Sequence, residues 1–379
     1  MSRGPQRSGL RAYLLGEGWP YLLTPFIVVA VVLEVVHGPA VAVFGASALG
    51  VIPPAALMGR ATEELADRSG PGIGGLLNVT FGNAPELIIA LFALARGLHE
   101  VVKATLVGSI LGNVLLVLGA AMVWGGLREG RSRGRQRFNR SAANAQSAML
   151  LLAAAALTMP AVFQLVEGGA LPHPGSERTD FVSAVDELSL VVAAILIVSY
   201  GFGLLFSLRT HRDLFNPPED TDRHGAGWSV RRSAMLLALA GLVVGVMSEI
   251  LVGSISEAAR SVGLSEFFIG AVIVAIVGNA AEHWVAVLVA GKDRMDLAIN
   301  IAIGSSAQVA LFVAPVLVLV SFVLGPFPMA FVLNGFELGG VFLAVLIANH
   351  VTNEGESTWF EGVQLLAVYV VLGIAFYFA

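Results

Sequence analysis

The sequence predicts an all-α polytopic membrane protein of about eleven transmembrane helices, arranged as one N-terminal helix followed by two inverted five-helix repeats. Three observations predict this fold. Only 13% of the 379 residues are charged and 56% are hydrophobic, whereas a soluble globular protein carries about 25% charged residues. The apolar residues fall into long runs, and one short polar motif occurs twice. A lipid bilayer is therefore the solvent that we expect for this chain.

Composition also excludes several classes of function. The net charge of −5 provides no basic field for nucleic acid. The chain has no cysteine, which excludes disulfides, thiolate metal ligands and cysteine nucleophiles.

A spanning helix needs roughly 20 mainly apolar residues. Eleven runs meet this condition, over residues 20–37, 39–59, 71–96, 101–125, 142–166, 183–208, 232–253, 266–291, 295–322, 328–349 and 359–378. Arg3, Arg7 and Arg11 precede the first run, which a signal peptide would also show. We expect a retained helix, because the small-residue pattern at residues 46–48 lies inside the next run.

The distribution of basic residues predicts the orientation. If the N-terminus is cytoplasmic and the runs alternate, 18 of the 22 Lys and Arg residues fall in cytoplasmic segments. The four on the outer side are Arg96, Lys103, Arg178 and Arg260. This asymmetry is the one that the positive-inside rule expects.

An internal repeat organises the runs. Gly82–Glu86 reads Gly-Asn-Ala-Pro-Glu, and Gly278–Glu282, 196 residues later, reads Gly-Asn-Ala-Ala-Glu. The same offset carries Gly108-Ser109 onto Gly304-Ser305. An odd number of runs separates the two motifs, so their helices are antiparallel. Transporters with such inverted repeats bind substrate near the midplane, where the repeats meet.

The repeat divides the chain into four predicted segments. Residues 1–38 form the N-terminal tail and first helix, and residues 39–208 form the first five-helix repeat. Residues 209–231 form a cytoplasmic linker, and residues 232–379 form the second repeat.

Glu86 and Glu282 are the candidate cation ligands. Each lies in the middle of an apolar run, where an ionisable side chain normally faces a cavity or a partner. Pro85 removes a backbone donor and Gly82 loosens the helix, so we expect a broken helix with free carbonyl groups. Carboxylate and carbonyl oxygens suit Ca²⁺, and the second motif predicts a matching set. A purely structural, hydrogen-bonded role for each glutamate is the alternative reading.

The same pair predicts coupling to protons. Two close carboxylates repel when both are ionised, so protons bind when the metal leaves. Metal and protons therefore compete for one site, which favours exchange over leak.

The two motifs, with the residues after them, resemble the signature repeats of the cation/proton exchanger branch of the calcium/cation antiporter superfamily. Residues 263–270, residues 304–312 and residues 359–362 resemble further stretches of that family, so the resemblance covers nearly the whole chain from about residue 40. It implies Ca²⁺ and H⁺ as transported substrates, with no permanently bound cofactor.

The resemblance also implies site residues. Glu86 and Glu282 would bind metal and protons, and backbone carbonyls near Gly82 and Gly278 would complete the metal shell. Further polar residues would orient the carboxylates or line the access paths; these are Asn83, Asn279, Ser109, Ser305, Asn113 and Gln308. The two copies differ, because Pro85 matches Ala281 and Gly112 matches Gln308.

Several residues keep two interpretations. His283 is a proton shuttle or an orienting residue, since its charge changes near neutral pH. Gly108-Ser109 and Gly304-Ser305 line the site or simply let helices pack closely. Glu249 and Glu337 relay protons or pair structurally. The acidic residues 219–222 are expected to form a solvated loop, with metal sensing as the alternative.

Ca²⁺/H⁺ antiport by alternating access is the leading expectation. Related Na⁺/Ca²⁺ exchangers carry Ser or Thr where Asn83 and Asn279 stand, so proton coupling is favoured. A Na⁺/Ca²⁺-type exchanger, transport of Mn²⁺ or Cd²⁺, a glutamate-lined channel and a membrane hydrolase are the alternatives. We expect an integral protein of a prokaryotic inner membrane, in contact with lipid and not with nucleic acid; homo-oligomerisation is left open.

Overall fold

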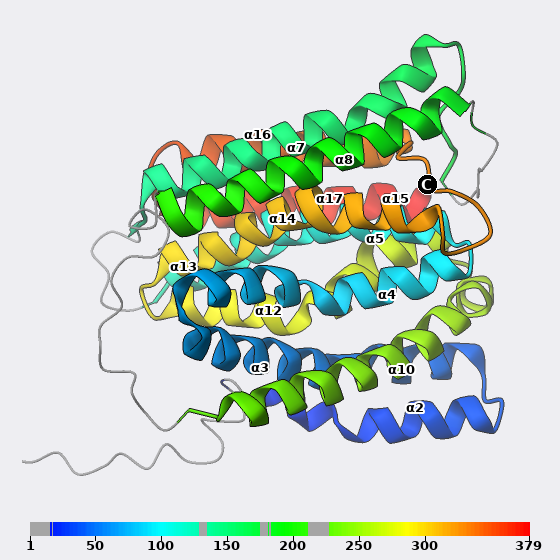
Figure 1. Cartoon of the computed structure of the whole chain (residues 1–379), viewed down its shortest axis with the longest axis horizontal. Coiled ribbons are helices and arrows are strands. Elements are labelled where there is room, and N and C mark those ends of the chain that lie inside the picture. Colours follow the sequence, from blue (N-terminus) through cyan, green and yellow to red (C-terminus); the bar gives the residue numbers. More distant parts are fainter. Residues whose placement is uncertain (1–15, 17, 129–134, 175–180, 182, 211–226) are drawn as a thin grey trace, which may run out of the picture.

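The computed structural model describes residues 16, 18–128, 135–174, 181, 183–210 and 227–379. Helices make up nearly all of the described chain, as the composition predicts. They run roughly parallel to one long direction of the molecule (Figure 1). The polytopic helical fold expected from the sequence is therefore confirmed.

The first half begins outside the predicted repeat and then makes five passes along the molecule. Its elements, in order, are η1 (Trp19–Leu23), α2 (Pro25–Val35), α3 (Ala40–Gly82), α4 (Ala84–Ala95), α5 (His99–Leu111), the π-helical η2 (Gly112–Val117), α6 (Leu118–Gly126), β1 (Arg135–Arg137), α7 (Arg140–Val166), α8 (Ser183–Leu205) and the π-helical η4 (Phe206–Thr210). The segments α5, η2 and α6 follow one another without a gap and form one crossing.

The second half repeats this scheme with more distortion. Its elements are α10 (Val230–Val262), α11 (Glu266–Phe268), the π-helical η5 (Ile269–Val274), α12 (Ala275–Gly291), α13 (Met295–Ile299), the π-helical η6 (Asn300–Gly304), α14 (Ser305–Gln308), the π-helical η7 (Val309–Val313), α15 (Ala314–Ser321), α16 (Gly335–Thr352), β2 (Glu356–Thr358) and α17 (Trp359–Phe378). The 196-residue offset carries η2 onto residues 308–313, and the π-helical η7 covers all of these except the first. This distortion therefore recurs in both halves.

The long helix α3 reverses direction between Ala66 and Gly74. A Cβ added at Gly74 would lie 2.9 Å from the carbonyl carbon of Ala66. In a straight helix, eight residues would separate these positions by about 12 Å. The helix therefore folds back on itself, and the predicted runs 39–59 and 71–96 are two antiparallel passes, as expected.

Three groups of helices lie across the molecule. In Figure 1, α2, α3 and α10 occupy one side, α7, α8 and α16 occupy the opposite side, and α4, α5, α12 and α14 lie between them. Helix α10 packs along α3, and α2 packs against α3 as well. The helices that carry the duplicated motif are thus in the middle group.

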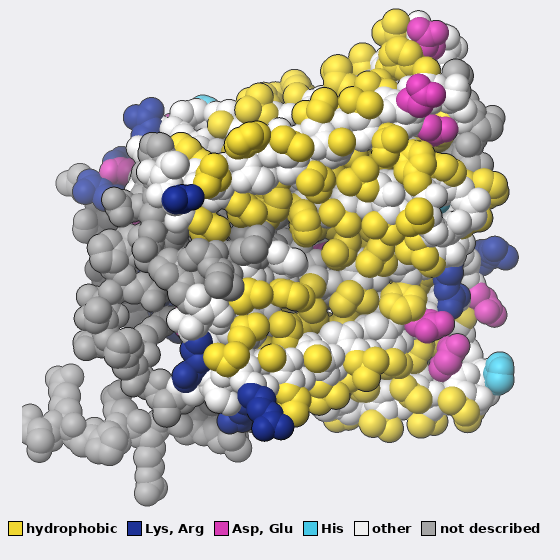
Figure 2. All heavy atoms as spheres, viewed as in Figure 1, with side chains coloured by type: hydrophobic (Ala, Val, Ile, Leu, Met, Phe, Trp, Pro, Cys, Tyr) yellow, Lys and Arg dark blue, Asp and Glu magenta, His cyan; other side chains and the backbone are white. Residues whose placement is uncertain are grey.

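At one end of the molecule α6 ends, α10 begins, and β1 pairs with β2. We call it the arginine-rich end, because its described residues include Arg60, Arg68, Arg128, Arg135 and Arg137. Strands β1 and β2 pair there as an antiparallel ribbon with Gln136 opposite Ser357. Arg68 donates to the carbonyl of Gly227 at 2.8 Å, and Arg128 donates to the carbonyl of Gly291 at 3.1 Å. Between the two charged ends, the visible surface is largely hydrophobic (Figure 2), as expected for a protein embedded in lipid.

Lys103 does not lie in a loop, although the charge count places it on the outer side. It stands in the second turn of α5, where its side chain is only 5% exposed. Its ammonium group donates to the carbonyl of Val332 at 3.0 Å. Lys103 therefore makes an internal contact and is not one of the loop charges on the outer side.

Nine helices in the described part of the chain are long and apolar enough to cross a membrane, and two shorter apolar helices, Trp19–Val35 and Ala84–Ala95, accompany them. The second of these is continued by the returning half of α3. The chain is thus an integral membrane protein, while the count of eleven crossings stays a prediction.

Candidate cation-binding site

The first motif breaks its helix, as the sequence predicts. Helix α3 ends at Gly82, Asn83 leaves helical geometry at φ −97° and ψ 21°, and α4 begins at Ala84. The cause is Pro85, which has no N–H to donate to the carbonyl of Phe81. The carbonyl of Gly82 is one of the last four of its helix, which lack intrahelical donors.

Glu86 lies in the first turn of the half-helix α4. The N-terminal end of a helix carries partial positive charge and favours a carboxylate. The side chain is 5% exposed, and its Oε2 atom is buried without a hydrogen-bond partner. The break therefore provides an electrostatically suitable place for a buried anion that still needs a cation or a proton.

The second motif does not break its helix, so the expectation of two broken helices is wrong. Helix α12 runs without interruption through Gly278–Glu282. Ala281 stands where the first copy has Pro85, and its backbone N–H keeps the helical ladder intact. The distortion in this half lies earlier, in the π-helical η5. The carbonyl of Gly278 thus stands inside a regular helix, unlike that of Gly82.

The two glutamates nevertheless meet. Glu86 packs against α12 about one helical turn before Glu282. A Cβ added at Gly278 would lie 3.7 Å from Cγ of Glu86, so α4 crosses α12 at this glycine. Ser305 donates to Oε2 of Glu282 at 3.2 Å. The structure therefore brings one carboxylate from each half to a common place between the helices.

The motif asparagines bond to the other half of the molecule. Asn83 donates to Oε1 of Gln308 at 2.6 Å. Asn279 donates to the hydroxyl of Ser109 at 3.1 Å and to the carbonyl of Ala275 at 2.9 Å. Both amide NH₂ groups thus form hydrogen bonds to the other half of the molecule, and the amide oxygens point away from these partners.

Three buried acceptor oxygens from the two motifs have no donor within hydrogen-bond distance: Oδ1 of Asn83, Oδ1 of Asn279 and Oε2 of Glu86. A buried acceptor without a partner costs free energy, and such oxygens are the ligands that Ca²⁺ prefers. The described residues contain no group of three or more His, Asp or Glu side chains placed to hold a metal ion. Any cation here would therefore combine two carboxylates with amide, hydroxyl or carbonyl oxygens.

His283 and Asn113 form a contact beside this group. The Nε2 atom of His283 lies 3.0 Å from Oδ1 of Asn113. The amide nitrogen of Asn113 is buried without a partner. The sequence motif placed His283 next to Glu282, and the structure adds that it faces the π-helical η2, which carries Asn113.

The Gly-Ser pairs show both features left open above: the serines contact motif residues, and the glycines let helices pack closely. Both serines contact motif residues, Ser109 through Asn279 and Ser305 through Glu282. Gly108 packs so closely that an added Cβ would lie 2.6 Å from the carbonyl carbon of Ala271. Gly304 faces Asn300, whose Oδ1 would lie 3.2 Å from an added Cβ.

Glu63 was missed by the sequence reasoning. It lies exposed on α3, near the arginine-rich end, and its charge acts on Glu282. The available signal was the acidic pair Glu63-Glu64 at the end of an apolar run. That signal is typical of an ordinary solvated turn.

The other intramembrane acids do not join the site. Glu249 pairs with Arg96 at 3.9 Å, and both side chains are largely exposed. Glu337 forms a capping box at the start of α16, accepting from the backbone N–H of Asn334 at 2.8 Å. Both glutamates thus make structural contacts, while Oε1 of Glu337 is buried without a hydrogen-bond partner, and proton relay stays the alternative prediction. The acidic residues 219–222 lie outside the described residues.

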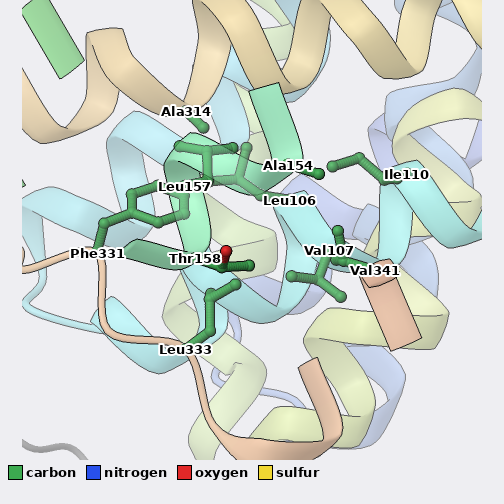
Figure 3. A pocket seen from close by; sticks show the side chains of 10 residues that line it. All are labelled: Leu106, Val107, Ile110, Ala154, Leu157, Thr158, Ala314, Phe331, Leu333 and Val341. Carbon is green, nitrogen blue, oxygen red and sulfur yellow. The ribbon is translucent and has the colours of Figure 1, made fainter. Parts of the chain in front are cut away.

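A pocket between α5, α7, α15 and α16 is a different place (Figure 3). Nine of the ten residues that line it are apolar, and Thr158 is the exception. Its hydroxyl donates to the carbonyl of Ala155 in its own helix at 2.9 Å. No residue of the duplicated motif lines this pocket, so it is not where a cation would bind.

Comparison with known proteins identifies relatives over nearly the full chain. The family described as sodium/calcium exchanger protein matches residues 39–209 and 232–378. A Ca²⁺/H⁺ antiporter of Aphanothece halophytica is 41% identical over 367 residues, which are 93% of this chain and 94% of that protein. The Ca²⁺/H⁺ antiporter ChaA of Bacillus subtilis is 41% identical over 360 residues, covering 94% and 97%.

Solved structures agree with this result. The structure of native YfkE matches with a TM-score of 0.79 at 38% identity, covering 95% of this chain and all of that one. An H⁺/Ca²⁺ exchanger CAX matches with a TM-score of 0.68 at 16% identity, covering 95% and 91%; at that identity the match shows the fold alone.

Proposed function

Because this chain belongs to the sodium/calcium exchanger protein family, we propose that it is a secondary antiporter that exchanges Ca²⁺ for H⁺ by alternating access. One observation carries the proposal: α4 and α12 bring Glu86 and Glu282, one from each half, to a common place among buried oxygens that lack donors. Relatives that are 41% identical over nearly the whole chain are Ca²⁺/H⁺ antiporters, which supports the same conclusion.

The proposed Ca²⁺ ligands are the carboxylates of Glu86 and Glu282, with the carbonyl of Gly82 and the amide oxygens of Asn83 and Asn279. Two carboxylates balance the charge of one divalent ion. We retain Gly278 as a predicted carbonyl ligand, but its place inside a regular helix favours a packing role, in which it makes room for Glu86.

Proton coupling follows from the same pair. When Ca²⁺ leaves, two neighbouring carboxylates in a poorly solvated place repel each other, and protons relieve the repulsion. Because Ca²⁺ needs the deprotonated form, each binding event displaces protons. Ser305 donates a hydrogen bond to Glu282, which stabilises the ionised, metal-ready form.

A Na⁺/Ca²⁺-type exchanger is the second candidate, because the fold also matches the sodium–calcium exchanger NCX_Mj with a TM-score of 0.52 at 16% identity. The side chains of the site argue against this candidate. Asn83 and Asn279 use their NH₂ groups on Gln308 and Ser109, and at these two positions the chain offers no hydroxyl groups as additional Na⁺ ligands.

We further propose that the arginine-rich end faces the cytoplasm and that the membrane is a prokaryotic inner membrane. The excess of Lys and Arg at this end supports the orientation. The bacterial sources of several relatives support the membrane.

The test is ion flux in liposomes that hold the purified protein. An imposed pH gradient should drive uptake of radioactive Ca²⁺, while an entrapped dye records proton movement in the opposite direction. Glu86→Gln and Glu282→Gln should each abolish the flux. Glu249→Gln is the matched control, because this glutamate is also in a membrane helix but pairs with Arg96.

Each other outcome identifies an alternative. Uptake that follows a Na⁺ gradient and ignores the pH gradient would indicate the Na⁺/Ca²⁺-type exchanger. Ca²⁺ flux without proton movement in either direction would indicate a channel. Near wild-type exchange in either glutamate variant would exclude these two carboxylates as ligands.

A further inference from the structure

The buried side chain of Gln146 joins α7 to the segment that carries Ser305. Its Nε2 atom donates to Oδ1 of Asn300, the first residue of the π-helical η6. Gln146 is only 8% exposed, whereas Asn300 is exposed. Because a buried amide without a partner costs free energy, this hydrogen bond fixes the direction of the Gln146 side chain. We call the two side chains the amide pair.

The amide pair lies against Gly304, the last residue of η6. A Cβ added at Gly304 would lie 3.2 Å from Oδ1 of Asn300 and 3.5 Å from Nε2 of Gln146. Asn300 and Gly304 are four residues apart, so they lie on the same side of the turn. The amide pair therefore contacts both ends of η6 and holds this turn against α7.

Ser305 directly follows this turn, and its hydroxyl donates to Oε2 of Glu282 at 3.2 Å. A π-turn bonds residues that are five apart, whereas an α-turn bonds residues that are four apart. The side chains after a π-turn therefore point in a different direction from those of an uninterrupted α-helix. The hydrogen bond from Ser305 to Glu282 thus depends on the geometry of η6.

The corresponding turn of the first half is packed in another way. The 196-residue offset matches Gly304 with Gly108 and Asn300 with Ala104, which has no amide. Gly108 packs on backbone, since an added Cβ would lie 2.6 Å from the carbonyl carbon of Ala271. The nearest atoms to an added Cβ at Gly304 all belong to the amide pair. Direct backbone contact thus fixes the turn in the first half, and the amide pair takes this place in the second.

We propose that Gln146 is a positioning residue for ion exchange: its hydrogen bond to Asn300 holds η6 so that the Ser305 hydroxyl stays on Glu282. This inference rests on the proposed function, because it assigns a role at the same site. Gln146 does not touch the ion. It acts through Asn300 and Ser305.

The first experiment measures Ca²⁺/H⁺ exchange in liposomes over a range of Ca²⁺ concentrations. Gln146→Leu removes the amide and keeps a side chain of similar size. Because a typical hydrogen bond contributes about 1 kcal/mol, the half-saturating Ca²⁺ concentration should rise about fivefold, with a maximal rate within about twofold of wild type. Since Gln146 acts through Ser305, adding Gln146→Leu to Ser305→Ala should cause no further rise.

An exchange of the two amides tests the contact itself. Asn300→Leu removes the acceptor and should behave as Gln146→Leu does. Gln146→Asn combined with Asn300→Gln restores an amide pair of the same total length, so it should return the half-saturating concentration to within about twofold of wild type. An exchanged pair as impaired as the single leucine variants would overturn the proposal.

Gln164→Leu is the matched control. This glutamine is also buried in α7, at 3% exposed, and it lies against Gly169 beyond the C-terminal end of that helix. Its replacement should leave the half-saturating concentration unchanged. Multiplicative effects of Gln146→Leu and Ser305→Ala in the double variant would overturn the proposal. So would a lower maximal rate with unchanged half-saturation, which a merely structural glutamine would cause.

The second experiment needs no transport and remains available if Gln146→Leu does not fold. Asn300→Leu changes the more exposed member of the amide pair. Thermal unfolding of the purified protein is followed as Ca²⁺ is added, and the Ca²⁺ concentration needed for a given stabilisation should rise about fivefold in this variant. Equal Ca²⁺ titrations of wild type and Asn300→Leu would overturn the inference. Should wild-type transport prove independent of protons, the proposed function fails while this titration still decides the role of the amide pair.

Discussion

Ser305 links the glutamate of the second half to the neighbouring helix. Its hydroxyl donates to Glu282 at 3.2 Å, whereas Ser306 donates only to the carbonyl of Ala302 in its own helix. A hydrogen bond to a charged group contributes about 1.5–3 kcal/mol, and here it favours the ionised carboxylate over the protonated one.

Ser305→Ala should therefore weaken Ca²⁺ in its competition with protons. We expect the half-saturating Ca²⁺ concentration to rise about tenfold, which corresponds to about 1.4 kcal/mol. Ser306→Ala removes an equally buried hydroxyl and should leave it unchanged. Measuring Ca²⁺ dependence of exchange in liposomes at fixed pH decides the question; equal behaviour of the two variants would contradict the role given to Ser305.

At the scale of single residues, the sequence identified which side chains gather but not how they pair. The family resemblance implied Asn83, Asn279, Ser109 and Gln308 as members of the site. Their hydrogen bonds depend on which helix faces which, and that is decided by packing between segments about 200 residues apart.

At the scale of helices, Pro85 is the residue that makes the two copies of the motif fold differently. It interrupts the helix between α3 and α4 and leaves the carbonyl of Gly82 at a helix end. Pro85 itself stands in the first turn of α4, where proline is tolerated. The cost of the break is the carbonyl group of Gly82, which loses its intrahelical donor where a cation would bind.

Pro85→Ala should restore the missing N–H and let α3 continue into α4. We expect a melting temperature equal to or above that of the wild type, and exchange reduced about tenfold because the carbonyl ligand is lost. Pro160→Ala in α7 is the control, since that proline also lies inside a helix but away from the motifs. Full exchange activity in Pro85→Ala would show that the break is not needed for binding.

The helices show where sequence patterns suffice. Run length and hydropathy predicted the long apolar helices, because both follow from bilayer thickness, and Pro85 predicted the break. The uninterrupted α12 was predicted wrongly, because the argument for a break was extended from Pro85 to a copy that has Ala281. The π-helical segments were not predicted from the sequence. The pairing of β1 with β2 joins loops that are far apart in sequence and was equally hidden.

At the scale of the whole molecule, the orientation can be tested by chemistry that the chain makes simple. Because it has no cysteine, a single introduced thiol is the only target for an impermeant maleimide. Lys292→Cys at the arginine-rich end should react in intact cells only after permeabilisation. Ser261→Cys, at the opposite end of α10, should react without it. The reverse pattern would overturn the cytoplasmic placement of the arginine-rich end.

Binding of Ca²⁺ between the two halves should also stabilise the whole protein. A ligand that binds only the folded state adds about 2.7 kcal/mol at one hundred times its dissociation constant, so saturating Ca²⁺ should raise the melting temperature by several degrees. Ca²⁺ needs both carboxylates ionised and displaces protons as it binds. At a fixed Ca²⁺ concentration the stabilisation should therefore grow as the pH rises and shrink as the pH falls.

The measurement is thermal unfolding of the purified protein across a range of pH, with and without Ca²⁺. Glu86→Gln and Glu282→Gln should lose the Ca²⁺-dependent shift while folding normally, since each removes a charge from a buried pair that repels itself in the absence of metal. Glu249→Gln should keep the shift. A Ca²⁺ effect of equal size in all four proteins would place the ion somewhere other than between α4 and α12, and a shift independent of pH would separate Ca²⁺ binding from proton release.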